Sequence, residues 1–135
     1  VETWVKEAID RPGKLLTGGA RISSTVFQPT VILEPSPAAL VSQQEVFGPL
    51  PCIYGYADLE DAIACANNLP FAFQAAVFTS DIHAALTTAR LLDASAVLIN
   101  DHTAFRTDWM PFPAGARATV PVVFPKPCAK CSITR

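Results

Sequence analysis

The hydrophobic positions of this chain follow two spacings, and these predict alternating helices and strands. Val1, Trp4, Val5, Ala8 and Ile9 recur at helical spacing, so we expect a helix that ends before the breaker pair at residues 12–13. Short hydrophobic runs with strand character follow at residues 15–16, 27–33, 50–56, 73–79 and 96–99. Pro29 lies inside the second run and predicts an edge or irregular strand there.

Two further helices are expected between the last three strands. Asp58 is placed to cap the first of them, and Ser80 to cap the second. Each has hydrophobic positions at i, i+3, i+4 and i+7, which predict these buried residues: Leu59, Ala62, Ile63 and Ala66, then Ile82, Ala85, Leu86 and Ala89. Strand, helix, strand, helix and strand at this spacing predict an α/β fold with parallel-sheet βαβ units.

The length, hydropathy and charge of the chain limit the classes of protein to which it could belong. A chain of 135 residues predicts one domain with a sizeable core. Half of the residues are apolar, but no apolar run reaches the roughly 20 residues that span a bilayer, and we expect neither a signal peptide nor a membrane partner. A net charge of −2 gives no basic surface for nucleic acid. The expected compartment is the reducing cytoplasm.

The four cysteines predict no metal site. Cys52 and Cys65 lie in strand-like and helix-like runs, so we expect two reduced, buried thiols that serve packing. Cys128 and Cys131 have C-x-x-C spacing, which occurs in zinc and redox sites. Neither histidine lies at finger-like spacing from them, and a four-cysteine zinc site would require the first two thiols to converge on a distant tail.

The segment Glu45-Val46-Phe47-Gly48-Pro49 precedes an apolar strand and carries candidate chemistry. Loops at strand ends of α/β sheets are where such folds place ligand contacts. An ionised Glu45 accepts hydrogen bonds only, so paired sugar hydroxyls or a cation would suit it. Chemistry alone nevertheless favours a solvated loop carboxylate for Glu45 and a core aromatic for Phe47.

An ordered series of motifs resembles the NAD(P)-dependent aldehyde dehydrogenase superfamily. The matching segments, in chain order, are Trp4-Val5, Leu15-Leu16-Thr17-Gly18-Gly19, Pro29-Thr30-Val31, Glu45-Val46-Phe47-Gly48-Pro49, Asp58-Leu59-Glu60-Asp61-Ala62-Ile63, Ala66-Asn67, Ala76-Val77-Phe78-Thr79, Val97-Leu98-Ile99-Asn100-Asp101 and Met110-Pro111-Phe112. Order and spacing agree over residues 1–112, so the chain is identified as resembling the C-terminal part of the catalytic domain.

The resemblance implies roles for individual residues. Glu45 looks like the glutamate that holds the hydroxyls of the nicotinamide ribose of NAD or NADP, and Phe47 like the aromatic beside the nicotinamide. Asn100, Phe105 and Phe112 resemble positions that line or support the aldehyde pocket. Arg106 follows the pocket phenylalanine; it either pairs with an anionic aldehyde or is an ordinary surface arginine.

The residues that perform the family's chemistry are not found in this sequence. The family uses a cysteine thiolate that attacks the aldehyde and a glutamate that activates water, and both precede the segment that this chain resembles. None of the four cysteines has the nucleophile's sequence context, and no glycine-rich phosphate loop is present. We therefore expect no catalytic residue, no cofactor binding by this chain alone, and no activity of the isolated chain.

Three interpretations remain at this stage. In the first, the chain is a dehydrogenase fragment that associates with a second copy of itself or with a complementary dehydrogenase fragment. In the second, it is a non-enzymatic α/β interaction or structural module derived from that fold. In the third, which has the least support, it acts as a metal-binding or redox protein through the C-x-x-C.

The tail after Phe112 departs from the family. Relatives continue with a glycine-rich segment, whereas residues 113–135 do not. Back-translation with a shifted frame permits Ser-Gly-Tyr-Gly-Thr-Gly-Gly-Ile-Pro from the junction of Ala116 and Arg117, which is what one branch of the superfamily carries there. We therefore predict a partial catalytic domain over residues 1–112 and a tail over 113–135 that is translated out of frame, and that is either disordered or packed opportunistically.

Overall fold

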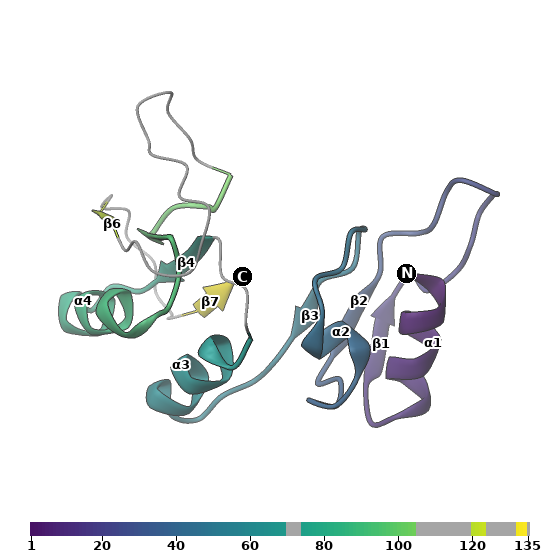
Figure 1. Ribbon diagram of the computed structural model, residues 1–135, viewed down its shortest axis with the longest axis horizontal. Helices are drawn as coiled ribbons and strands as arrows, with labels where there is room; N and C mark the ends of the chain where they lie inside the picture. The colour runs from purple at the N-terminus through teal and green to yellow at the C-terminus, as the bar shows by residue number, and fades with distance from the viewer. Residues whose placement is uncertain (70–73, 105–119, 124–131, 135) are drawn as a thin grey trace. The chain divides into compact units, whose positions relative to one another are not determined.

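A computed structural model describes residues 1–69, 74–104, 120–123 and 132–134 of the chain. The fold divides into two compact units, Val1–Tyr56 and Ala57–Arg135. Both combine helices with a small sheet (Figure 1), so the predicted α/β class is confirmed.

Unit 1 is a three-stranded sheet with two helices. Its elements are α1 (Glu2–Asp10), β1 (Lys14–Thr17), β2 (Val31–Leu33), α2 (Leu40–Gln43) and β3 (Cys52–Ile53). The strand order is β1-β2-β3, with β1 antiparallel and β3 parallel to β2. Of the two alternatives predicted for residues 27–33, the edge strand was wrong, because Pro29 precedes β2 and β2 lies at the centre of the sheet. The pairing is irregular, since the register of β1 against β2 shifts between Leu15 and Thr17.

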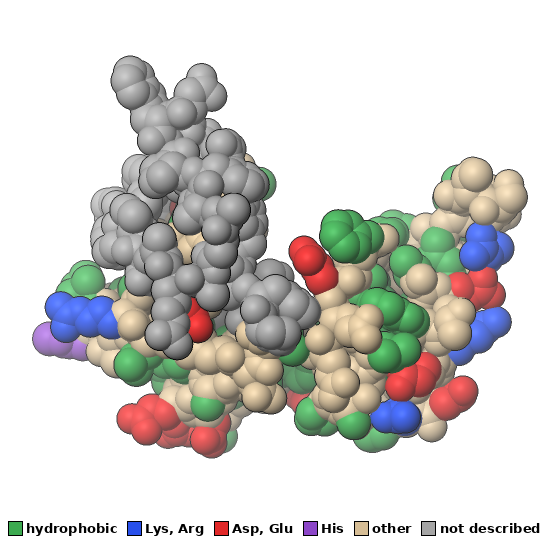
Figure 2. Space-filling model, viewed as in Figure 1, with side chains coloured by type: hydrophobic (Ala, Val, Ile, Leu, Met, Phe, Trp, Pro, Cys, Tyr) green, Lys and Arg blue, Asp and Glu red, His purple; other side chains and the backbone are tan. Residues whose placement is uncertain are grey.

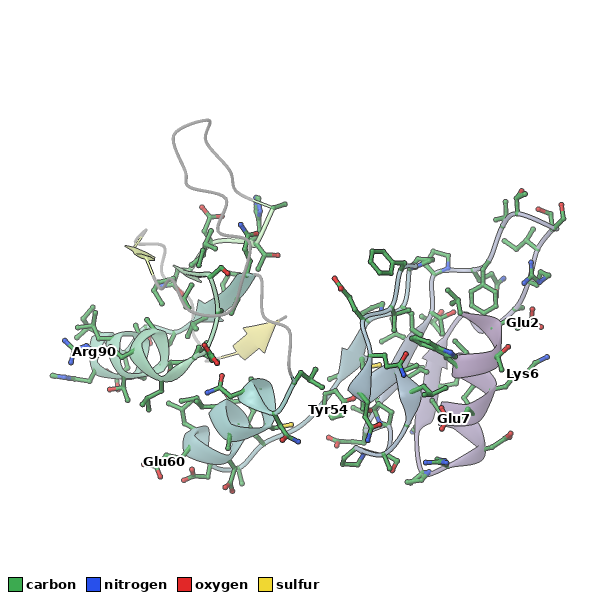
Figure 3. The ribbon with its side chains drawn as sticks, in the orientation of Figure 1. Glu2, Lys6, Glu7, Tyr54, Glu60 and Arg90 are labelled. Atoms are coloured by element: carbon green, nitrogen blue, oxygen red, sulfur yellow. The ribbon has the colours of Figure 1, made fainter. Side chains whose placement is uncertain are left out.

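The core of unit 1 forms between its helices and one face of its sheet. Its buried residues are Val5, Ala8, Ile32, Ala39, Val41 and Leu50. The short helix α2, which the sequence did not predict, is held by a carboxylate from the other helix. Glu7 Oε2 accepts a hydrogen bond from the Leu40 amide at 3.0 Å, in place of a cap from α2's own Ala39. Figure 3 shows Glu7 on α1 with Glu2 and Lys6.

Unit 2 contains the predicted βαβ arrangement. Its elements are α3 (Leu59–Asn67), β4 (Gln74–Phe78), α4 (Ile82–Leu91), β5 (Ala96–Ile99), β6 (Val120–Val123) and β7 (Ser132–Thr134). Strands β4 and β5 are parallel and joined through α4, and the sheet order is β6-β5-β4-β7. Among the described residues, β3 and β4 therefore belong to separate sheets rather than to one continuous sheet.

The tail supplies strands to unit 2. Residues 120–123 form β6, parallel to β5, and residues 132–134 form β7, antiparallel to β4. These described parts of the tail are packed against the sheet and occupy both edges of the β4–β5 pair (Figure 1).

The helices of unit 2 are capped by aspartates. Asp58 accepts hydrogen bonds from Glu60 N and Asp61 N, as predicted. The second cap is Asp81 and not Ser80: its carboxylate accepts from His83 N at 2.8 Å and Ala84 N at 3.3 Å. An ionised carboxylate one residue later outcompetes the neutral hydroxyl for the free amides of the first turn.

The buried face of α4 also differs from the prediction. Ala85 and Ala89 are buried as expected, but Ile82 is 57% exposed and Leu86 40% exposed. Thr88 is buried in their place. Ala85, Thr88, Ala89 and Leu92 also follow helical spacing, and this face of small side chains lets the helix lie close to the β4–β5 pair.

Candidate functional site

The segment Glu45–Pro49 forms a loop that is fixed at both ends and exposed in the middle. It follows α2 and leads into β3. Val46 packs against the core of unit 1, and Leu50 is buried in that core. Between these anchors Phe47 is 88% exposed, and Figure 2 shows that hydrophobic side chains reach the surface of unit 1 among polar ones. The expectation from chemistry alone, that Phe47 is a core aromatic, was therefore wrong.

Hydrogen bonds within the backbone give the loop two tight turns. The Gly48 amide donates to Val46 O at 3.0 Å, and the Leu50 amide donates to Gly48 O at 2.8 Å. Pro49 O accepts from the Thr30 amide at 2.9 Å, which ties the loop to the start of β2. The loop is thus a defined platform for a single exposed ring.

Glu45, two positions before Phe47 in the sequence, is exposed. It forms no ion pair with any residue that the structure describes. Its oxygens are therefore available to accept hydrogen bonds from a ligand, and two adjacent hydroxyls match the geometry of one carboxylate. Phe47, two residues away in the sequence, adds an exposed apolar ring to the same loop.

Asn100 directs its side chain inward at the end of β5. Its Oδ1 accepts from the Thr79 amide at 2.8 Å, and its Nδ2 donates to Thr79 O at 2.9 Å. Its own amide donates to Val77 O at 2.8 Å, and its φ is +56°. Asn is tolerated in this left-handed conformation more readily than most residues.

The Asn100 contacts continue into the cap of α4. Thr79 Oγ1 accepts from the Asp81 amide at 3.1 Å, and Asp81 caps the helix. Of the two roles that the resemblance allows, Asn100 therefore has the contacts of a supporting residue in this network. The other three predicted pocket residues, Phe105, Arg106 and Phe112, lie outside the described residues.

The two described cysteines differ from each other. Cys52 is half-buried in unit 1, and burial raises the pKa of its thiol. Cys65 is exposed on α3, so the expectation that it is a buried packing thiol was wrong. Both are free thiols. The described residues contain no group of three or more His, Cys, Asp or Glu side chains that could hold a metal ion.

Sequence reasoning missed Asn67, which fastens the two helices of unit 2. Its Nδ2 donates to Leu91 O at 2.7 Å, and its Oδ1 accepts from the Asp93 amide at 2.8 Å. The Ala66-Asn67 motif was the available signal, because an Asn in the last turn of a helix can satisfy the free groups of a neighbouring helix end.

No helix among the described residues is long and apolar enough to cross a bilayer.

Comparison with known proteins agrees with this geometry. The sequence model of the aldehyde dehydrogenase family matches residues 1–119. A lactaldehyde dehydrogenase of Methanocaldococcus jannaschii is 41% identical over 113 residues, which are 83% of this chain and 24% of the relative. A 3-sulfolactaldehyde dehydrogenase of Priestia megaterium is 35% identical over 112 residues, which are 83% of this chain and 23% of the relative.

Solved structures give the same result. Aldehyde dehydrogenase 21 of Physcomitrella patens, in complex with its reaction product succinate, matches with a TM-score of 0.78 and 37% identity, over 82% of this chain and 23% of that one. A glyceraldehyde-3-phosphate dehydrogenase of Methanocaldococcus jannaschii, complexed with NADP, matches with a TM-score of 0.77 and 36% identity, over 86% and 24%. This chain spans about a quarter of the length of these relatives, and it belongs to the aldehyde dehydrogenase family.

Proposed function

We propose that this chain supplies the nicotinamide-ribose side of the cofactor site of an NAD(P)-dependent aldehyde dehydrogenase. The observation that carries the proposal is the exposure of Phe47, 88%, on a loop whose flanking residues are anchored in the core. Burying a bare aromatic ring against a flat ligand is favourable, and the neighbouring Glu45 carboxylate would accept from the ribose hydroxyls. The bound nucleotide would supply hydride acceptance, while these two residues would orient it.

The residues that the resemblance assigns to the aldehyde pocket belong to unit 2, and we propose the same roles for them here. Asn100 would hold the ends of β4 and β5 in place through its two bonds to Thr79. Phe105 and Phe112 would line the pocket, and the guanidinium of Arg106 would pair with an anionic group of the aldehyde.

The chain alone is proposed to oxidise no aldehyde. A nucleophilic cysteine needs a lowered pKa, whereas burial raises that of Cys52, and Cys65 lies on the surface of a helix. Glu45 and Phe47 contact only one end of a dinucleotide in this proposal, so the affinity of the isolated chain for NAD or NADP would be low.

The proposed partner is a complementary segment of a dehydrogenase, or a second copy of this chain. The burial of β4 and β5 supports this, because strands buried along almost their whole length are typical of the centre of a larger parallel sheet. Here their outer neighbours are the short tail strands β6 and β7.

We also propose that residues 113–135 are translated out of frame. The two sequence relatives named above align over 112 or 113 of the 135 residues, and the family model matches residues 1–119, so none of these matches covers the whole chain. The shifted frame permits the glycine-rich continuation of the family in this region. The coding DNA tests this directly: third bases that cannot encode Gly-Tyr-Gly-Thr-Gly-Gly would rule it out.

The main experiment measures NAD(P)H formation from a panel of aldehydes. We expect none from the chain alone, and activity once it is mixed with the preceding part of the Methanocaldococcus jannaschii relative. In the mixture, Glu45→Ala and Phe47→Ala should lower kcat/KM by at least about tenfold each, whereas Glu60→Ala on α3 serves as an exposed control. Activity of the chain alone that disappears on thiol alkylation would contradict the proposal.

A non-enzymatic interaction module is the second candidate, and the outer face of α4 favours it. Ile82 and Leu86, which lie one turn apart, are 57% and 40% exposed there. A helix with bulky side chains outside and small ones inside presents an apolar surface that a partner could cover. Failure of the mixture to form NAD(P)H, together with stable association of the two polypeptides, would favour this candidate.

A further inference from the structure

Thr30 is a buried residue whose hydroxyl and amide are both hydrogen-bonded, and these bonds join two segments of unit 1. Its side chain is 0% exposed. Its hydroxyl accepts from the Gly19 amide at 2.8 Å and donates to Gln28 O at 2.8 Å. Its own amide donates to Pro49 O at 2.9 Å. One residue thus contacts the turn after β1 and the candidate cofactor loop.

In the turn after β1, Gly18 lies very close to Pro29 and Thr30. Gly18 has φ +79°, and a Cβ placed on it would lie 2.1 Å from Pro29 O and 2.7 Å from Thr30 Oγ1. Only glycine combines this backbone conformation with so close an approach. The turn therefore fixes the position of residues 29–30 from one side.

The loop is fixed from the other side by the Thr30 amide. Further along the strands, Ile32 N donates to Pro51 O at 3.3 Å and Glu34 N donates to Ile53 O at 2.8 Å. The Thr30–Pro49 bond is thus the first of three in the same register, and it is the one next to Phe47. Proline has no amide hydrogen, so its carbonyl is the only backbone group through which Pro49 can be held.

We propose that Thr30 is a positioning residue for the cofactor loop: its hydroxyl, bonded to Gly19 N and Gln28 O, fixes the residue whose own amide holds Pro49. This inference rests on the proposed role of Glu45 and Phe47 as cofactor contacts. Loss of the hydroxyl should loosen the exit of the loop and let Phe47 move, while the core of unit 1 stays folded. The matched variants are Thr30→Val, which keeps the shape, and Thr30→Ser, which keeps the hydroxyl.

The first test is amide hydrogen exchange of the full chain, followed by NMR. Thr30→Val should accelerate exchange at residues 19, 30 and 50 by about tenfold, which corresponds to the loss of roughly one hydrogen bond. Thr30→Ser should stay within about threefold of the parent chain. Thr88→Val makes the same chemical change at a fully buried threonine of unit 2 and should leave these three amides unchanged.

Two results would overturn the proposal: unchanged exchange at residue 50 in Thr30→Val, or equal acceleration in Thr30→Ser. The parent chain provides a measurement that needs no variant. If Thr30 couples the two segments, the amides of Gly19, Thr30 and Leu50 should share one opening free energy, and separate values would contradict the coupling.

The second test uses the chain mixed with the preceding part of a relative, as above. Thr30→Val should raise KM for NAD(P) about tenfold with little change in KM for the aldehyde, and Thr30→Ser should restore it. A purely structural defect would lower the amount of active complex and leave both KM values unchanged, which would overturn the positioning role. If the parent mixture is inactive, the proposed function fails, and hydrogen exchange alone then decides the role of Thr30.

Discussion

Thr30 and Thr88 are both completely buried threonines, one in each unit, and they use their hydroxyls in opposite ways. The Thr30 hydroxyl accepts one hydrogen bond and donates another. The Thr88 hydroxyl has no partner among the described residues. Burial alone therefore says little about why a polar residue is present; the bonds that it makes distinguish a residue that connects segments from one that fills space.

The candidate site residues of the two units also differ in whether their side chains already have partners. Glu45 and Phe47 are exposed, while both side-chain polar atoms of Asn100 are hydrogen-bonded to Thr79. All three belong to motifs shared with the family. The side chains of the first kind are open to solvent, and the one of the second kind holds the ends of β4 and β5 together.

The largest effect is expected at Asn100. Asn100→Ala removes both bonds to Thr79, leaves a buried amide unpaired and keeps an unfavourable φ, so unit 2 should lose about 2–4 kcal/mol of stability. Asn100→Gly should lose about 1 kcal/mol less, because glycine tolerates positive φ. Hydrogen exchange of the β4 and β5 amides measures both. Glu45→Ala, an exposed change, should stay within about 0.5 kcal/mol; an equal loss there would erase the contrast.

The second effect concerns Thr30. Thr30→Val leaves the Gly19 amide without an acceptor and should lower the free energy of unfolding of unit 1 by about 1–3 kcal/mol. Thr30→Ser should recover most of the loss, since it restores both hydrogen bonds. The exchange rates of the slowest amides of α1 report this free energy. A Thr30→Val chain as stable as the parent would show that the two bonds contribute nothing net.

Thr88 should give the opposite sign. Replacing its unpartnered hydroxyl by a methyl group removes a desolvation cost, so Thr88→Val should raise the stability of unit 2 by about 1 kcal/mol. The two residues have similar helix propensities, so the backbone adds little. Hydrogen exchange of the β4 and β5 amides, followed as a function of denaturant concentration, measures the gain. Destabilisation would mean that the hydroxyl has a partner that the described residues do not include.

The comparison also shows which parts of this structure could be predicted. The spacing of hydrophobic residues predicted β4, α4 and β5, because these elements are local in sequence and fully patterned. It did not predict α2, which has no cap of its own and depends on Glu7, 33 residues away from its first amide. On α4 it predicted Ala85 and Ala89 correctly but Ile82 and Leu86 wrongly, because those two follow the same helical spacing as the buried Thr88 and Leu92.

The site was predictable to a similar extent. The motif of residues 45–49 pointed to the loop, and the resemblance pointed to Asn100, whose role in an aldehyde pocket stays a prediction. The contacts of Asn100 with Thr79, and of Thr30 with Gly19 and Pro49, could not be read from the sequence because they join residues that lie far apart along it. A pattern of residue types carries no distances, so it cannot separate an exposed functional group from one that is already paired.

The smallest expected effect is the pH dependence of the exposed network on α1, which contrasts with the buried bonds above. Hydrogen bonding to Arg21, and then to Lys6, lowers the pKa of Glu2. A carboxylate with a lowered pKa in the folded state stabilises it above the usual glutamate pKa, and this contribution is lost as the pH falls through the folded value. Because the pair is exposed, salt should screen it, unlike the Thr30 bonds.

The measurement compares the parent chain with Glu2→Gln at about pH 7 and about pH 3. In low salt the parent should have a slightly higher unfolding midpoint than the variant near neutral pH, and the difference should disappear in acid. High salt should also remove it. A difference that persisted in acid would show that Glu2 acts through packing of its side chain and not through its charge, and α1 would then be held in the same way as the buried threonine network.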